Sequence, residues 1–95
     1  MFVDAVEFCK QFPDYKVVDY IQLSAIEVGN EVQLKSQGEN IWVTVVSIIP
    51  QSDCNNMFTG KVIKEPMFHQ PFNKGSIVDF ETRQIFNVRL EYERF

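Results

Sequence analysis

Apolar residues recur at spacings of three and four over residues 1–12 and predict an amphipathic N-terminal helix. The stripe consists of Phe2, Ala5, Val6, Cys9 and Phe12, which fall on one side of a helix with about 3.6 residues per turn. Lys10 stands towards the end of this segment, where the helix dipole favours a positive charge. Pro13 ends the helix, because proline disfavours helical geometry at the residue before it.

After residue 28 the pattern changes to the alternation that is typical of β-strands. Strands are predicted at residues 32–35, 41–49, 57–65, 76–80 and 83–95, joined mostly by short polar turns. The last segment alternates most regularly, with apolar residues at 86, 88, 90 and 92 and polar or charged residues between them. It is predicted to be a half-buried strand with a charged outer face. Residues 15–23 fit either a helix or a strand, and both remain open.

The segment 41–49 is apolar on both of its faces. Alternation assigns one face to Ile41, Val43, Val45 and Ile49, and the other to Trp42, Val46 and Ile48 together with Thr44. Both faces must therefore be covered. We expect the first face to fill the core and the N-terminal helix to cover the second, burying Trp42. If the helix packs elsewhere, another subunit or a partner protein is expected to cover that face.

These elements predict a single domain over residues 1–95, with a helix at 1–12 and a sheet at 28–95. One helix followed by about five strands is typical of the α+β class. We predict a strongly curled, mostly antiparallel five-stranded sheet of the kind found in SH3-like small barrels, with the N-terminal helix packed on it.

Composition and charge restrict the function. No stretch reaches the roughly 18 apolar residues of a membrane helix, and two cysteines are too few for a disulfide framework, so a cytoplasmic location is expected. The net charge is −4, and all of it lies in residues 1–50, which hold three lysines against seven acidic residues. A nucleic-acid ligand is disfavoured, since phosphate binding needs a basic surface. An acidic face containing Glu27, Glu31 and Glu39 instead favours a partner protein with a basic surface.

The sequence contains no recognisable catalytic, metal or cofactor motif. His69 is the only histidine, and Cys9 and Cys54 lie far apart without a metal-ligand spacing. The glycines form no phosphate-binding motif. Cys9 belongs to the apolar stripe of the predicted helix and is expected to be buried. We therefore predict no cofactor, no metal and no enzymatic activity.

Aromatic residues and prolines between residues 66 and 74 identify a candidate binding loop. Met67, Phe68 and His69 are of the types enriched at interfaces, and the prolines limit the entropy lost when the loop becomes ordered. Phe72 is expected to turn into the core instead. Together with Trp42, these three loop residues and the three glutamates form the predicted partner-binding set.

Residues 28–87 contain a set of short motifs that resembles the pattern of a known protein family. The run Glu39-Asn40-Ile41-Trp42-Val43 is followed in order by Phe58-Thr59-Gly60, Glu65-Pro66 and Gly75-Ser76-Ile77-Val78-Asp79-Phe80, with Ile85 after them. In this the chain resembles the small bacterial and phage domain-of-unknown-function family 2314. The resemblance implies a compact, sheet-rich domain and brings no catalytic residues.

Three functional hypotheses follow. The first is a non-enzymatic module that binds another protein, in one form a phage or mobile-element inhibitor of a host protein that acts through its acidic face. The second is a small enzyme or ligand-binding barrel that uses His69 and nearby carboxylates. The third is a homodimer whose special surface is its own interface.

Overall fold

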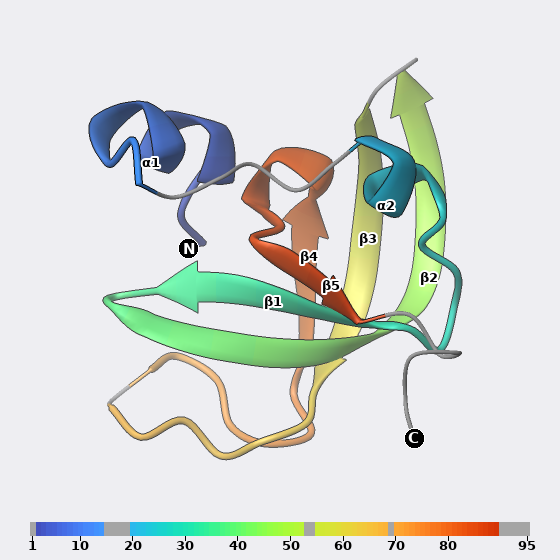
Figure 1. The fold of residues 1–95 in the computed structure, drawn as a ribbon. Helices are drawn as coiled ribbons and strands as arrows, with labels where there is room; N and C mark the ends of the chain where they lie inside the picture. Colours follow the sequence, from blue (N-terminus) through green and yellow to red (C-terminus); the bar gives the residue numbers. More distant parts are fainter. Residues whose placement is uncertain (1, 15–19, 53–54, 69, 90–95) are drawn as a thin grey trace.

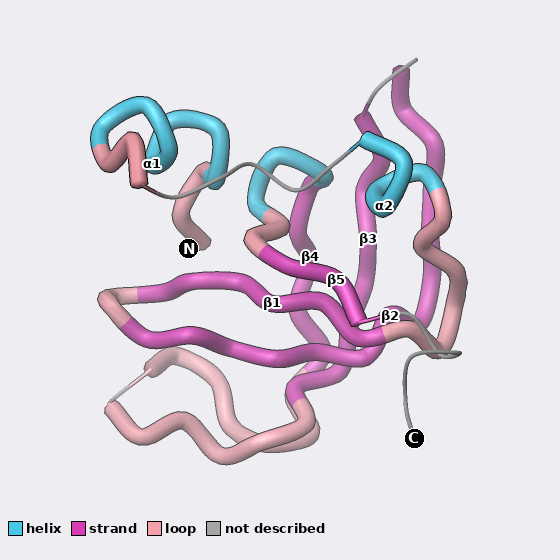
Figure 2. The backbone as a smooth tube through the Cα atoms, viewed as in Figure 1, coloured by secondary structure: helices cyan, strands magenta, loops and turns pink. Residues whose placement is uncertain are grey.

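The computed structural model describes residues 2–14, 20–52, 55–68 and 70–89. Two short helices precede the strands, and a 3₁₀ turn separates the last two strands (Figures 1 and 2). The elements are α1 (Ala5–Gln11), α2 (Tyr20–Ser24), β1 (Glu31–Ser36), β2 (Glu39–Ser52), β3 (Asn55–Val62), β4 (Ile77–Glu81), η1 (Thr82–Gln84) and β5 (Asn87–Arg89).

The strands form one antiparallel sheet in the order β4-β3-β2-β1-β5. This confirms the predicted α+β class with five antiparallel strands. The long strand β2 pairs with β1 through its first half and with β3 through its second half, and Figure 1 shows it bending between the two. In the described part of the chain β4 and β5 are the sheet edges and do not pair with each other, so the predicted strongly curled, SH3-like small barrel is not confirmed.

The N-terminal helix is shorter than the predicted span 1–12. It begins after Asp4, whose carboxylate accepts a hydrogen bond from the backbone N–H of Glu7 at 3.1 Å, as is typical of an N-cap. The preceding residues are extended, because the backbone N–H of Val3 donates to the carbonyl of Lys35 at 2.9 Å. Pairing with β1 therefore takes the first residues out of the helix. In the undecided segment 15–23, residues 20–23 are helical, and residues 15–19 lie outside the described residues.

A tight turn joins β1 to β2. Gln37 and Gly38 form it with φ values of 50° and 81°, and positive φ at both central residues is the signature of a type I′ hairpin turn. The turn places Ser36 opposite Glu39, so these two side chains share the face of the sheet on which Leu34 and Ile41 are buried. The hairpin thus fixes which face each later residue of β2 occupies.

A β-bulge in β2 reverses the predicted roles of two isoleucines. The register with β3 shifts between Val45 and Ser47, so one additional residue, Val46, is accommodated there. Because side chains alternate with a period of two, the insertion exchanges the faces of the residues that follow it, as far as a second register shift after Pro50. Ile48 therefore packs against the core, while Ile49 is 55% exposed. The sequence pattern had assigned Ile49 to the core, and that assignment is wrong.

The N-terminal helix does not pack where the sequence placed it. It lies against η1, and the ring of Phe8 meets Phe86 edge-on with centroids 5.2 Å apart. Phe2 and Ala5 are buried, whereas Phe12 at the end of the stripe is 49% exposed. The reason is the backbone contact with the second half of β1, since the hydrogen bond from Val3 to Lys35 holds α1 beside the sheet. The expected burial of Trp42 under this helix is therefore not found.

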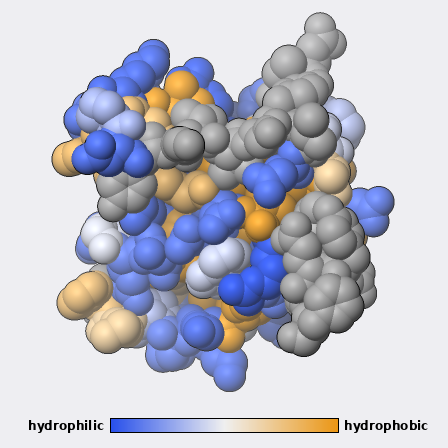
Figure 3. Space-filling view, in the orientation of Figure 1, coloured by the Kyte–Doolittle hydropathy of each residue, from blue (hydrophilic) through white to orange (hydrophobic). Residues whose placement is uncertain are grey.

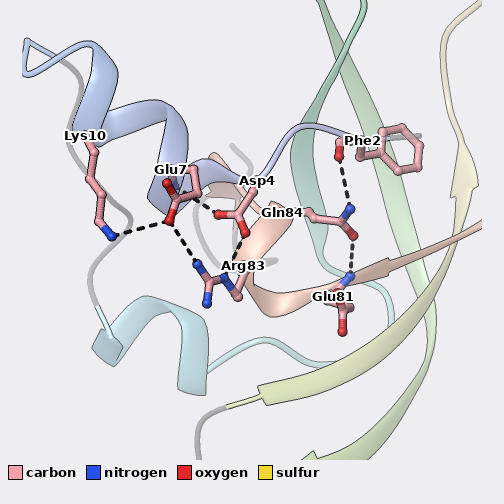
Figure 4. A network of polar contacts seen from close by, with 7 residues as sticks. All are labelled: Phe2, Asp4, Glu7, Lys10, Glu81, Arg83 and Gln84. Atoms are coloured by element: carbon pink, nitrogen blue, oxygen red, sulfur yellow. Dashed lines mark hydrogen bonds and ion pairs between the residues drawn. The ribbon is translucent and has the colours of Figure 1, made fainter.

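The predicted strand over residues 83–95 is replaced in its first part by η1. The backbone N–H of Glu81 donates to the side-chain oxygen of Gln84 at 2.8 Å, and the amide of Gln84 donates to the carbonyl of Phe2 at 3.1 Å (Figure 4). These bonds stabilise a 3₁₀ turn, and the strand begins only at Asn87. Residues 90–95 of the predicted strand lie outside the described residues.

The described residues have one hydrophobic core, between the sheet and the segments that precede and follow it. Phe58 and Phe80 stack at its centre with ring centroids 5.3 Å apart. Gly60 lies beside them, where a Cβ would come within 2.9 Å of both Phe80 and Val43. The absence of a side chain at Gly60 thus allows these rings to pack closely. The buried apolar residues are Phe2, Ile26, Val32, Leu34, Ile41, Val43, Val45, Phe58, Val62, Phe72, Val78, Phe80, Ile85 and Val88.

Candidate functional site

Glu39 is the centre of a hydrogen-bond network at the end of the β1–β2 hairpin. Its carboxylate accepts hydrogen bonds from the backbone N–H groups of Met67 at 2.6 Å and Phe68 at 3.1 Å. The side-chain amide of Gln70 donates to the same carboxylate at 3.3 Å. One side chain of β2 thus holds three groups of the loop between β3 and β4.

These bonds lower the pKa of Glu39. The hydrogen bond from the backbone of Met67 is the largest cause, opposed by desolvation and assisted by the bonds from Phe68 and Gln70. Each donor favours the ionised form of the carboxyl. At neutral pH Glu39 is therefore an anion whose oxygens are occupied within the chain.

A buried pair of polar side chains also holds this loop to the β1–β2 hairpin. Gln70 and Ser36 are 7% and 1% exposed. The hydroxyl of Ser36 donates to the side-chain oxygen of Gln70 at 2.9 Å, and the amide of Gln70 donates to the carbonyl of Ser36 at 3.0 Å. Because buried polar groups are costly to separate from their partners, this pair fixes the loop to the hairpin. The sequence analysis missed Gln70, and only its place between two prolines could have indicated it.

The fixed loop presents two large apolar side chains to solvent. Met67 is 86% exposed and Phe68 is 62% exposed, while Phe72 turns into the core as expected and is 6% exposed. In Figure 3 hydrophobic surface is visible at the tip of this loop, at the lower left. His69, the third predicted residue of the loop, lies outside the described residues.

Trp42 lies on the face of the sheet opposite the core, here called the outer sheet face. The guanidinium of Arg89 lies 4.7 Å from the centre of the Trp42 ring, within the range of a cation–π contact. The same guanidinium is 3.2 Å from the carboxylate of Glu31. Trp42 is half-buried by these neighbours and keeps part of its surface open.

The three glutamates of the predicted acidic face do not form one face. Glu31 pairs with Thr44 on the outer sheet face, whereas Glu39 lies opposite the buried Ser36. The predicted common face is therefore wrong, because strand alternation puts Glu31 and Glu39 on opposite sides of the hairpin. Glu27 is exposed in the segment before β1.

Other acidic residues of the first half are paired with basic residues. Arg83 lies 2.9 Å from Asp4 and 3.7 Å from Glu7, and Lys10 lies 3.3 Å from Glu7 (Figure 4). Arginines from the second half of the chain thus balance carboxylates of the first half. At these positions the surplus of acidic residues in the first half of the sequence therefore does not produce an acidic surface.

A groove brings three of the predicted residues together. It has a volume of about 240 Å³ and is lined by Glu39, Trp42 and Met67 together with Gln33, Asn40, Ile41, Lys64, Glu65 and Pro66. The hairpin and the loop form its two sides. The sequence predicted these three residues by their types, and their proximity follows from the hydrogen bonds of Glu39 to the loop.

The outer sheet face carries further apolar side chains that the predicted set omitted. Val46 is 44% exposed and Ile49 is 55% exposed, and Val46 and Ile63 line a second hollow of about 570 Å³ with Thr44, Lys61, Val62, Lys74 and Gly75. The apolar second face of the segment 41–49 was the signal that could have added Val46. Ile49 was hidden from sequence analysis by the bulge.

The residues first considered as metal ligands do not gather into one site in the described part of the chain. No group of three or more His, Cys, Asp or Glu residues that could hold a metal occurs among the residues described. Cys9 is half-buried on α1, less buried than its place on the apolar stripe predicted. Cys54 lies outside the described residues. No helix found in the described ranges is long and apolar enough to cross a membrane.

The chain was compared with protein-family models, with curated proteins and with solved structures, and no match was found in any of the three.

Proposed function

We propose that this chain is a non-catalytic module that binds another protein through its outer sheet face. The observation that carries the proposal is an apolar face without the expected cover, since Trp42, Val46 and Ile49 are partly or largely exposed there and α1 packs against η1 instead. Exposed apolar surface that is contiguous and rimmed by polar groups is typical of protein interaction sites.

The loop with Met67 extends this surface at one end. The groove between Trp42 and Met67 is concave, and the loop is held by Glu39 before any partner arrives. A preorganised loop loses less entropy on binding. Arg89, Glu31 and Lys61 surround the apolar residues on this face, so the partner is expected to be apolar at the centre of its contact surface and to carry both signs of charge around it.

We also propose that the scaffold of this module is a partly open SH3-like barrel. Its support is that β1 lies between β2 and β5, so the last strand returns to the first hairpin. Such a scaffold leaves the outer side of the sheet available to a partner.

The test compares two variants, each of which replaces an apolar residue of similar exposure with lysine. Val46→Lys alters the outer sheet face, and Phe12→Lys alters the C-cap of α1; the two side chains are 44% and 49% exposed. The immobilised protein and both variants are used to capture proteins from a lysate of the source organism, after thermal unfolding has shown that all three are folded. We expect a protein that wild type and Phe12→Lys retain and Val46→Lys loses.

Two results would contradict the proposal. If all three proteins retain the same set, the outer sheet face has no part in binding. If sedimentation instead shows a dimer that Val46→Lys dissociates, the face binds a second copy of the chain, which is the homodimer hypothesis.

A further inference from the structure

Strand β4 has one side without a partner strand in the described sheet. It is at the end of the strand order and pairs only with β3. In the same ladder the backbone N–H of Val62 donates to the carbonyl of Ser76 at 2.9 Å. Hydrogen-bonded pairs alternate with non-bonded pairs in an antiparallel ladder, so Val78 and Phe80 bond to β3 as Ser76 does. Ile77 and Asp79 consequently direct their backbone N–H and C=O groups away from β3.

The available part of this edge is short and defined. Beyond Asp79 it ends, because the N–H of Glu81 donates to the side chain of Gln84 at 2.8 Å. Ile77 is 60% exposed and Asp79 is exposed. A hollow of about 470 Å³ lies along the edge, lined by Pro71, Phe72, Ser76, Ile77, Val78 and Asp79. Four outward backbone groups and a neighbouring hollow are what an added strand requires.

The charges of the edge specify the chemistry of its occupant. Asp79 and Glu81 are the ionisable side chains of β4, and Lys61 lies one strand further in, opposite Ile77. Acidic residues on an edge strand disfavour pairing with a second copy, since the copy brings the same carboxylates to the interface. A strand with basic residues is favoured instead. Its alternate side chains would face the hollow beside Phe72, which suits apolar residues.

We propose that the outer edge of β4 accepts an extended segment of a partner protein as an added strand, with basic side chains beside Asp79 and apolar side chains towards the hollow lined by Phe72. The segment pairs through the backbone groups of Ile77 and Asp79. This site goes beyond the proposed function, because it uses the sheet edge and the backbone and does not include Val46 or Trp42.

The experiment uses three synthetic hexapeptides as probes and the full ¹⁵N-labelled chain. The first peptide alternates Lys and Val, the second alternates Glu and Val, and the third is the first with both of its central residues, one Lys and one Val, replaced by Pro. We expect the Lys–Val peptide to shift the amide signals of Ile77 and Asp79 and to slow their hydrogen exchange. The Glu–Val peptide is expected to bind at least about tenfold more weakly at low salt, and the Pro peptide likewise, because proline lacks a donor.

Two variants test separately how the charge of Asp79 and the outward backbone N–H groups contribute to peptide binding. Asp79→Lys is expected to reverse the preference between the Lys–Val and Glu–Val peptides. Ile77→Pro removes one outward N–H, keeps both carboxylates of β4 and leaves the ladder with β3 intact, as proline is tolerated at the first residue of an edge strand, and it should abolish binding of the Lys–Val peptide. The amide spectrum and thermal unfolding of each variant verify the fold.

The proposal is overturned if the Lys–Val peptide leaves Ile77 and Asp79 unaffected at millimolar concentration, or if the Pro peptide binds as well. Protection of the two amides that rises with protein concentration in the absence of peptide would also overturn it, because the occupant would then be a second copy.

Discussion

Glu39 shows how a residue selected for its charge can have a different use in the folded chain. By its charge and position in the sequence it is one of three carboxylates expected to meet a partner. In the structure its oxygens accept bonds from Met67, Phe68 and Gln70. Its charge therefore organises a loop, and the apolar side chains of that loop become the exposed groups. A charge-reversal variant at this residue would disturb the loop as well as any partner.

The pH dependence of the loop follows from the lowered pKa of Glu39. A carboxyl with a lower pKa in the folded state stabilises the fold above its unfolded pKa, and this contribution is lost as the pH falls through the folded value. We expect the amide signals of Met67 and Phe68 to titrate in that acidic range, and their protection from hydrogen exchange, relative to the intrinsic exchange rate at each pH, to fall there. Glu39→Gln should remove the titration and accelerate exchange already at neutral pH, measured by NMR.

The matched control is Glu27→Gln, which removes an exposed glutamate in the segment before β1. It should leave the titration of the two loop amides unchanged. An unaltered titration in Glu39→Gln would show that another group controls the loop.

At the scale of the element, β2 shows the effect of a single additional residue. Its first half follows the alternation of the sequence, with Ile41, Val43 and Val45 buried. The bulge at Val46 then exchanges the two faces, so an apolar side chain reaches the outer sheet face where strict alternation would have placed it in the core. The bulge thereby enlarges the surface that we propose for binding.

Two substitutions in β2 test the bulge directly. Ile48→Ala is expected to lower the free energy of unfolding by about 1–3 kcal/mol, because Ile48 packs against the core and its truncation leaves a cavity. Ile49→Ala removes an exposed side chain and should change stability by less than about 0.5 kcal/mol. Denaturant unfolding of both variants gives the comparison. A larger loss for Ile49→Ala would restore simple alternation and contradict the bulge.

At the scale of the whole molecule, ion pairs connect the two ends of the described chain. Arg83 on η1 contacts Asp4, the N-cap of α1, across 79 positions of sequence. Phe2 accepts a bond from Gln84 in the same region. Together these contacts dock α1 beside η1 (Figure 4), which is why the helix leaves the outer sheet face open.

A double-mutant cycle measures the docking contribution of the ion pair. Asp4→Ala, Arg83→Ala and the double variant should give a coupling of about 0.2–1 kcal/mol at low salt, because both side chains are partly solvated. The coupling should approach zero at about 1 M salt, where the screening length is about 3 Å. A coupling that persists unchanged at high salt would show that the pair acts through something other than charge.

Local sequence patterns predicted the helices and strands well, but they did not predict which elements pack against each other. The helix near the N-terminus, the α+β class and the antiparallel strands follow from the periods 3.6 and 2, which depend only on residues close in sequence. The groove residues Trp42 and Met67 were selected by residue type alone. Gln70 was missed because its role depends on Ser36, 34 positions away.

The sequence by itself determined the hydrophobic stripes, and through them the kind of each element and the core face of the first half of β2. The tertiary structure alone decided where α1 docks, where β2 shifts its register and which carboxylates meet basic side chains. The physical reason is the distance along the sequence over which each interaction acts. Backbone periodicity is set within a few residues. An ion pair such as Arg83–Asp4, or the contact of Glu39 with its loop, forms only after distant segments have been brought together.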